Sequence, residues 1–175
     1  MTATRMLLPF VTLLITTTTA AQDVEYQRAV ERAQQARPAA LASTGRIAPA
    51  EEPGAPLVIR GRLLNVDGSP AGGAIVFAYH TDRAGLYDVR EKGPHSWRLR
   101  GWVKTDAQGR FTFETIRPGS YPGTTQAPHV HFTAFLPSGE RYHAGELEMS
   151  RQTPDLKGKT EEATVTLKLD PRQKF

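Results

Sequence analysis

Short runs of alternating or continuous apolar residues dominate the chain from Leu57 onward. Each run is separated from the next by a turn sequence rich in Gly, Pro, Asp or Ser. Because successive side chains of a strand point to opposite faces, this pattern is typical of strands with a buried face. Short strands at such spacing predict an all-β fold, an antiparallel β-sandwich. The expected strands span residues 57–66, 73–80, 100–105, 110–115, 129–136 and 163–169.

A different periodicity precedes the strands. Tyr26, Ala29, Val30, Ala33 and Ala36 recur at spacings of three and four residues, and Pro38 follows them. This pattern predicts a short N-terminal helix over residues 23–37 whose alanine-rich face packs against a partner surface. Residues 38–56, rich in Ala, Pro and Glu, are equally typical of a connecting arm and of a disordered leader.

The first residues have the features of an export signal. Arg5 precedes an apolar run over residues 6–15, which is too short to span a bilayer, and small residues follow up to Ala21. This predicts a signal peptide over residues 1–21, cleaved after Ala20 or Ala21, and a secreted or periplasmic protein. The alternative is an uncleaved N-terminal anchor. The expected organisation is therefore a signal peptide (1–21), a helix and linker arm (22–56), and one β-sandwich domain (57–175).

Composition restricts the chemistry. The 175 residues include no cysteine, which excludes thiolate metal sites and cysteine nucleophiles. The net charge is +4 and the isoelectric point is about 9.6, but the basic residues are scattered. Scattered charge is not the footprint of a nucleic-acid partner, and we expect no membrane contact once the signal is removed. One long charged segment, residues 81–99, interrupts the strand pattern, and loops of this length are usually functional.

Two histidines on one strand are the candidate metal ligands. His129 and His131 are two residues apart, so they point to the same face of the strand. Tyr121 lies eight residues upstream of His129, across a Gly/Pro turn, and could supply a third ligand of a different kind, a phenolate. Imidazole with phenolate favours a hard ion such as Fe(III). The alternative is a pair of core or solvent-facing histidines with no metal.

Several motifs in the expected order resemble the intradiol ring-cleavage dioxygenases. The motifs are Gly85-Leu-Tyr87, the run Arg117-Pro-Gly-Ser-Tyr121-Pro and the run Pro128-His-Val-His-Phe132. The strand and turn over residues 56–70 also resemble the start of that fold. The resemblance covers residues 56–136, and the similarity fades after Leu136.

The resemblance implies a function and a set of ligands. It places Fe(III) on Tyr87, Tyr121, His129 and His131, with Tyr121 and His131 axial. It further implies that the enzyme opens a catechol-type ring between its two hydroxyls with O2, giving a muconate-type dicarboxylate. Such an oxidoreductase serves aromatic compound catabolism and needs no organic cofactor. In this family Tyr121 would leave the metal and accept a substrate proton.

One position departs from the family pattern. Gln126 stands three residues before His129, where the family commonly has an arginine that stabilises the electron-rich substrate. We therefore take Gln126 as a second candidate catalytic residue beside Tyr121. Arg98, Arg100 or Arg117 are alternative sources of the positive charge.

Two other classes of protein share parts of this pattern. A non-catalytic, secreted, transthyretin-like binding module would account for the first strands. A copper–zinc superoxide dismutase also carries a His-x-His pair, but it requires more histidines than the five present here. By analogy alone, the N-terminal helix suggests a homodimer.

Overall fold

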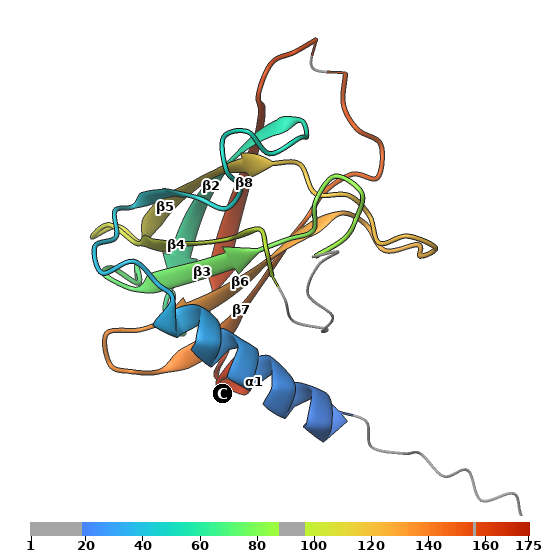
Figure 1. Cartoon of the computed structure of the whole chain (residues 1–175). Coiled ribbons are helices and arrows are strands. Elements are labelled where there is room, and N and C mark those ends of the chain that lie inside the picture. Colours follow the sequence, from blue (N-terminus) through green and yellow to red (C-terminus); the bar gives the residue numbers. More distant parts are fainter. Residues whose placement is uncertain (1–18, 88–96, 156) are drawn as a thin grey trace, which may run out of the picture.

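Two four-stranded sheets stack face to face in the computed structural model, which describes residues 19–87, 97–155 and 157–175 (Figure 1). The all-β sandwich expected from the sequence is confirmed. In one sheet the order is β1 (Thr44–Arg46), β5 (Arg110–Ile116), β2 (Pro56–Leu64) and β8 (Glu161–Lys168). In the other it is β4 (Arg100–Lys104), β3 (Ile75–Tyr79), β6 (His129–Phe135) and β7 (Arg141–Glu148).

The core lies between the two sheets and is built by alternation along the strands. Ile59 of β2 and Phe113 of β5 are fully buried from one side. Val76 of β3 and Val130 of β6 are fully buried from the other side. The intervening residues of β3 and β6 therefore face outward. This alternation places His129 and His131 on the outer face of the β4-β3-β6-β7 sheet.

Two strands were not expected from the sequence. Strand β7 pairs antiparallel with β6, after a turn at Pro137–Gly139, in the region where the motifs fade. Strand β1 lies in the arm and pairs parallel with β5, so this part of the arm is a strand. Strands β2 and β8 also pair in parallel, which makes their sheet mixed.

Helix α1 (Thr19–Gln35) covers the outer face of the β4-β3-β6-β7 sheet (Figure 1). It begins four residues before the expected start, and its buried side chains are Ala29, Val30 and Ala33. They pack in one cluster with Phe77 and Tyr79 of β3 and with neighbouring aromatic residues. The apolar face of the helix is thus covered by its own chain.

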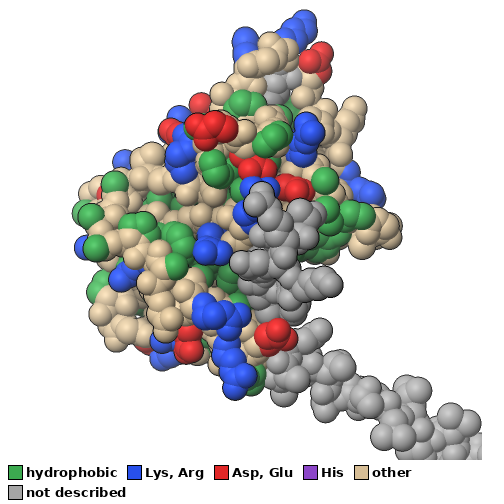
Figure 2. All heavy atoms as spheres, viewed as in Figure 1, with side chains coloured by type: hydrophobic (Ala, Val, Ile, Leu, Met, Phe, Trp, Pro, Cys, Tyr) green, Lys and Arg blue, Asp and Glu red, His purple; other side chains and the backbone are tan. Residues whose placement is uncertain are grey.

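The chain ends in a short 3₁₀ helix, η1 (Pro171–Gln173), near α1 (Figure 1). Within the described ranges, no helix is both long and apolar enough to span a bilayer. Most of the expected signal peptide, residues 1–18, and part of the long loop, residues 88–96, lie outside the described residues. On the face shown in Figure 2, basic and acidic side chains are interspersed.

Candidate metal centre

Four side chains from three parts of the chain meet at one point beside the end of β6. The Nε2 atoms of His129 and His131 are 3.0 Å apart. Tyr87 Oη lies 3.0 Å from His131 Nε2, and Tyr121 Oη lies 3.1 Å from His129 Nε2. The two phenol oxygens are in direct hydrogen-bond contact with each other. All four residues that the sequence proposed as ligands therefore converge, each through a ligating atom.

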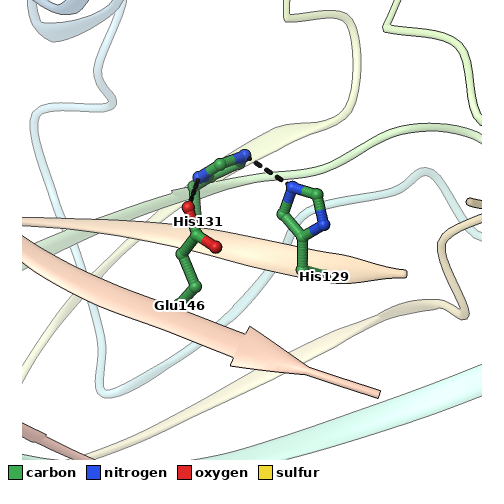
Figure 3. A group of neighbouring side chains, drawn as sticks. All are labelled: His129, His131 and Glu146. Atoms are coloured by element: carbon green, nitrogen blue, oxygen red, sulfur yellow. Dashed lines mark hydrogen bonds and ion pairs between the residues drawn. The ribbon is translucent and has the colours of Figure 1, made fainter. Parts of the chain in front are cut away.

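The outer nitrogens of both imidazoles are hydrogen-bonded to acceptors. His129 Nδ1 donates to the Ala127 carbonyl oxygen at 2.8 Å. His131 Nδ1 lies 2.8 Å from Glu146 Oε1 (Figure 3). A neutral imidazole carries one N–H, so these contacts leave a lone pair on each Nε2.

The inner atoms fit a shared metal ion. Two nitrogen lone pairs that face each other at 3.0 Å repel unless a cation lies between them. Metal–nitrogen bonds of about 2.0–2.1 Å place neighbouring ligand atoms on the order of 3 Å apart. The spacings around the four atoms have this size. The arrangement is one that can hold a metal ion.

Glu146 belongs to this cluster but acts from behind His131. One ligating atom from each of His129, His131 and Glu146 lies within 4.8 Å of the others. The Glu146 carboxylate, however, contacts Nδ1, on the side of the ring away from His129 (Figure 3). A carboxylate in this position orients the ring and raises the basicity of the opposite nitrogen.

An irregularity in the sheet puts Glu146 there. Counted from the turn at Pro137–Gly139, β6 and β7 pair residue by residue as far as the pair Thr133 and His143. The register then shifts between Phe132 and Thr133, so that His131 pairs with Glu146 and not with Gly145. Gly145 has a φ of +107°, which glycine tolerates at a bulge.

Aromatic stacking fixes the plane of the His131 ring. Tyr79, the residue paired with His131 on β3, stacks on it with ring centroids 4.7 Å apart and planes 18° apart. Trp97 in turn stacks on Tyr79, with ring centroids 4.0 Å apart and ring planes 20° apart. His131 thus has its plane held by Tyr79 and its Nδ1 held by Glu146.

The two tyrosines are placed by a close backbone contact between their loops. Gly85 has a φ of +81°, and a Cβ there would lie 1.9 Å from the Ser120 carbonyl oxygen. Gly119 N–H donates to the Asp82 carbonyl oxygen at 2.8 Å. Thr81 Oγ1 donates to the Gly119 carbonyl oxygen at 2.9 Å. Glycines let the segment before Tyr87 and the segment before Tyr121 touch.

Burial governs the protonation of Tyr87, Tyr121 and His131. Burial raises the pKa of Tyr87 well above the usual value of a phenol, and the contact with Tyr121 raises it further. Burial also raises the pKa of Tyr121. Either phenol therefore ionises near neutral pH only beside a strong cation. Burial, together with His129 and His143, lowers the pKa of His131 to about 4, so this ring is neutral and ready to ligate.

Gln126 is exposed in the turn between Tyr121 and His129. The three arginines considered as its substitutes are engaged elsewhere. Arg98 forms a bidentate ion pair with Glu52. Arg100 donates to the Trp97 carbonyl oxygen, and Arg117 pairs with Glu161. The role of Gln126 stays a prediction.

Three features of the site were not foreseen: Glu146, Tyr79 and the glycine contact between the tyrosine loops. Tyr79 was not recoverable from the sequence, because its place beside His131 depends on the pairing of β3 with β6. Glu146 was not recoverable, because the bulge determines which residue of β7 faces His131.

A mostly antiparallel sandwich that brings two histidines and two tyrosines to one point has the donor set of a non-haem metal site. The family model described as "Dioxygenase" matches residues 30–142, more than half of the chain. This chain belongs to the intradiol ring-cleavage dioxygenase family, as its motifs predicted.

Curated relatives agree over the same region. The chain is 31% identical over 102 residues to catechol 1,2-dioxygenase 2 of Acinetobacter lwoffii, covering 49% of this chain and 37% of the relative. It is 39% identical over 75 residues to 6-chlorohydroxyquinol 1,2-dioxygenase of Cupriavidus pinatubonensis, covering 43% of this chain and 27% of the relative. The matched region thus spans about a third of the length of these relatives.

Solved structures share the fold. An intradiol ring-cleavage dioxygenase from Tetranychus urticae superposes with a TM-score of 0.58 at 21% identity, covering 77% of this chain and 89% of that one. The dioxygenase domain of a carbohydrate-binding fusion from Streptomyces sp. SirexAA-E superposes with a TM-score of 0.56 at 23% identity, covering 76% of this chain and 91% of that one. Chains of nearly this extent therefore form the same sandwich.

Proposed function

We propose that this protein is an Fe(III)-dependent intradiol dioxygenase that opens a catechol-type ring between its hydroxyls, giving a muconate-type dicarboxylate. The observation that carries the proposal is the convergence of two phenol oxygens and two imidazole nitrogens at spacings of 3.0–3.1 Å. Family membership supports it, because the relatives named above are ring 1,2-dioxygenases.

The donor set favours Fe(III). Two phenolates offset two of the three charges of a hard trivalent ion, whereas zinc and copper sites favour imidazole or sulfur ligands. Tyr87, Tyr121, His129 and His131 would hold the ion. When bound, Fe(III) acts as a Lewis acid toward the two catechol oxygens and supplies the redox chemistry with O2.

The surroundings of the two tyrosines suit different tasks. Tyr87 follows Gly85, which is locked against Ser120, and its ring packs in the aromatic cluster around Tyr79. Tyr121, in contrast, begins a turn whose next five residues are exposed. We assign Tyr87 as the permanent ligand.

Tyr121 is then the proton acceptor. Its Oη contacts both Tyr87 Oη and His129 Nε2, and the turn that follows it is exposed, so we assign Tyr121 as the ligand that would leave the centre. A released phenolate is basic enough to take a proton from a catechol hydroxyl. Glu146 and Tyr79 meanwhile keep the His131 ring in place.

The test is a pair of matched substitutions, assayed for iron content, visible spectrum and catechol-dependent O2 uptake. Tyr121→Phe should keep iron but lose turnover by about 10²–10⁴-fold, the usual worth of a general base. Tyr87→Phe should instead lower iron content. Full activity in Tyr121→Phe would refute the assignment, and a colourless wild-type protein with stoichiometric zinc or copper would refute the function.

A second proposal concerns location. We propose that residues 1–21 direct export, so the mature protein is secreted or periplasmic. Cleavage after Ala20 or Ala21 would remove only the start of α1 and leave its buried residues Ala29, Val30 and Ala33 in place. Mass spectrometry of exported protein should show a first residue of Ala21 or Gln22, and an intact Met1 would contradict the proposal.

The expected homodimer also remains a proposal. Because the alanine face of α1 is buried within the chain, any contact through this helix would use its outer side, where Val24 is exposed. Sedimentation equilibrium of the wild type and Val24→Lys would measure the contribution of that side.

A further inference from the structure

A cavity of about 510 Å³ lies on the flank of the sandwich, and no part of the metal cluster lines it. Its walls come from residues 54–55 before β2, Arg83, residues 117–120 after β5, Pro128 before β6, and Arg151 and Thr153 after β7. Its volume is within the usual range of small-molecule sites, about 300–1,000 Å³. It is therefore large enough for a small organic ligand.

Three arginines line this cavity, and none of the described residues that line it is acidic. They are Arg83, Arg117 and Arg151. Arg117 is only 6% exposed, and it is anchored by Glu161 and by the Ser150 carbonyl oxygen. These two bonds use two of the five N–H donors of its guanidinium, which leaves donors for a ligand.

The other two arginines are exposed. Among the described residues, the Arg83 side chain forms no hydrogen bond or ion pair, and Arg151 makes one long contact of 3.4 Å to the Thr124 carbonyl oxygen. Because Glu161 offsets the charge of Arg117, Arg83 and Arg151 are the cavity arginines that form no ion pair within the described part of the chain, although the charge of Glu52 also reaches Arg83. Two separated guanidinium groups match a ligand with two carboxylates.

The cavity also touches the segments that carry the metal ligands. Gly119 and Ser120, which line it, directly precede Tyr121, and Pro128 directly precedes His129. Arg83 lies in the turn that leads to Tyr87. A ligand bound in this cavity would therefore contact the two loops that place Tyr87 and Tyr121, on their outer side.

We propose that this cavity is a binding site for a small dicarboxylate, held by Arg83 and Arg151 and bordered by Arg117. The site is separate from the metal centre. The choice of a dicarboxylate rests in part on the proposed function, because opening a catechol ring between its hydroxyls yields two carboxylates. The cavity would retain such an acid beside the loop that carries Tyr121.

The test uses the full iron-loaded chain and adipate, a saturated six-carbon dicarboxylate, in isothermal titration calorimetry. Wild type should bind adipate with an affinity that falls as salt is raised. Arg83→Gln and Arg151→Gln should each weaken binding by about ten-fold, the scale of one hydrogen bond to a charged group. Arg110→Gln removes an exposed arginine from β5, outside the cavity, and should bind adipate as wild type does.

The outcomes separate this proposal from the proposed function. Hexanoate, which has one carboxylate, and inorganic phosphate should both bind more weakly than adipate. Equal adipate binding in wild type and in both cavity variants, or no binding at all, would overturn the proposal whatever the colour of the protein. A colourless protein that binds adipate through these arginines would instead refute the iron proposal and leave the cavity site standing.

Discussion

Removal of the Glu146 carboxylate should lower the affinity of the candidate centre for its metal, although none of the four proposed ligands is changed. Glu146 Oε1 lies 2.8 Å from His131 Nδ1, so the carboxylate holds the proton on the outer nitrogen and keeps Nε2 free to ligate. Loss of such an orienting partner typically costs 10–100-fold in metal affinity. The Glu146 side chain is 40% exposed, which weakens the electrostatic part of the contact.

We therefore expect Glu146→Ala to lower Fe(III) affinity by about ten-fold, or about 1.4 kcal/mol. Glu146→Gln should have a smaller effect, because the amide oxygen still accepts a hydrogen bond from Nδ1–H but without the charge. The assay is competition for iron with a chelator, followed by the visible absorption of the protein.

Glu148→Gln is the matched control. Glu148 is exposed on the same strand and pairs with His129, whose Nδ1 is already bonded to the Ala127 carbonyl oxygen. Its substitution should leave iron affinity unchanged. Equal affinities for wild type, Glu146→Ala and the control would show that the carboxylate does not support His131.

Three further predictions follow from the same structure. Gly85→Ala should destabilise the protein and reduce iron content, because its Cβ would lie 1.9 Å from the Ser120 carbonyl oxygen. Gly123→Ala, which also has a positive φ (+74°) but no neighbour within 4 Å, should cost only about 1–2 kcal/mol of backbone strain in thermal denaturation. Burial lowers the pKa of His80 to about 4, so the free energy of unfolding should fall by up to about 1.4 kcal/mol per unit as pH drops from about 6.5 to 4. In chemical denaturation His80→Gln should show a smaller slope, because it loses the contribution of His80 and keeps that of His131, and an equal slope in both proteins would refute the prediction. Gln126→Arg should raise catechol turnover by about ten-fold, because a charge-assisted hydrogen bond is stronger than a neutral one. An unchanged rate at unchanged iron content would place Gln126 away from the substrate.

The sequence was sufficient to find the four side chains that converge, because each lies in a short local pattern or motif. His129 and His131 share a face by strand alternation alone, and Tyr87 and Tyr121 occur in motifs that resemble one family. The β-sandwich followed from the same alternation. These inferences needed no knowledge of which strands pair.

Features that depend on pairing could not be derived in this way. A regular hairpin counted back from the turn at Pro137–Gly139 would place Gly145 opposite His131, and the bulge replaces it with Glu146. Strand β1 has only three residues, and its place depends on a long-range parallel contact with β5. The arginine cavity likewise joins five stretches of the chain, from residue 54 to residue 153.

The stacked column of Trp97, Tyr79 and His131 gives the protein a built-in optical reporter. The chain contains two tryptophans, Trp97 and Trp102, and both pack in the aromatic cluster on the outer face of the sheet. The ring centroids of Trp97 and Tyr79 are 4.0 Å apart, and those of Tyr79 and His131 are 4.7 Å apart. A coloured ion beside the His131 imidazole would accept excitation energy from the indole. Intrinsic fluorescence should therefore dim as iron binds, so that loading can be followed in dilute, unlabelled protein without substrate.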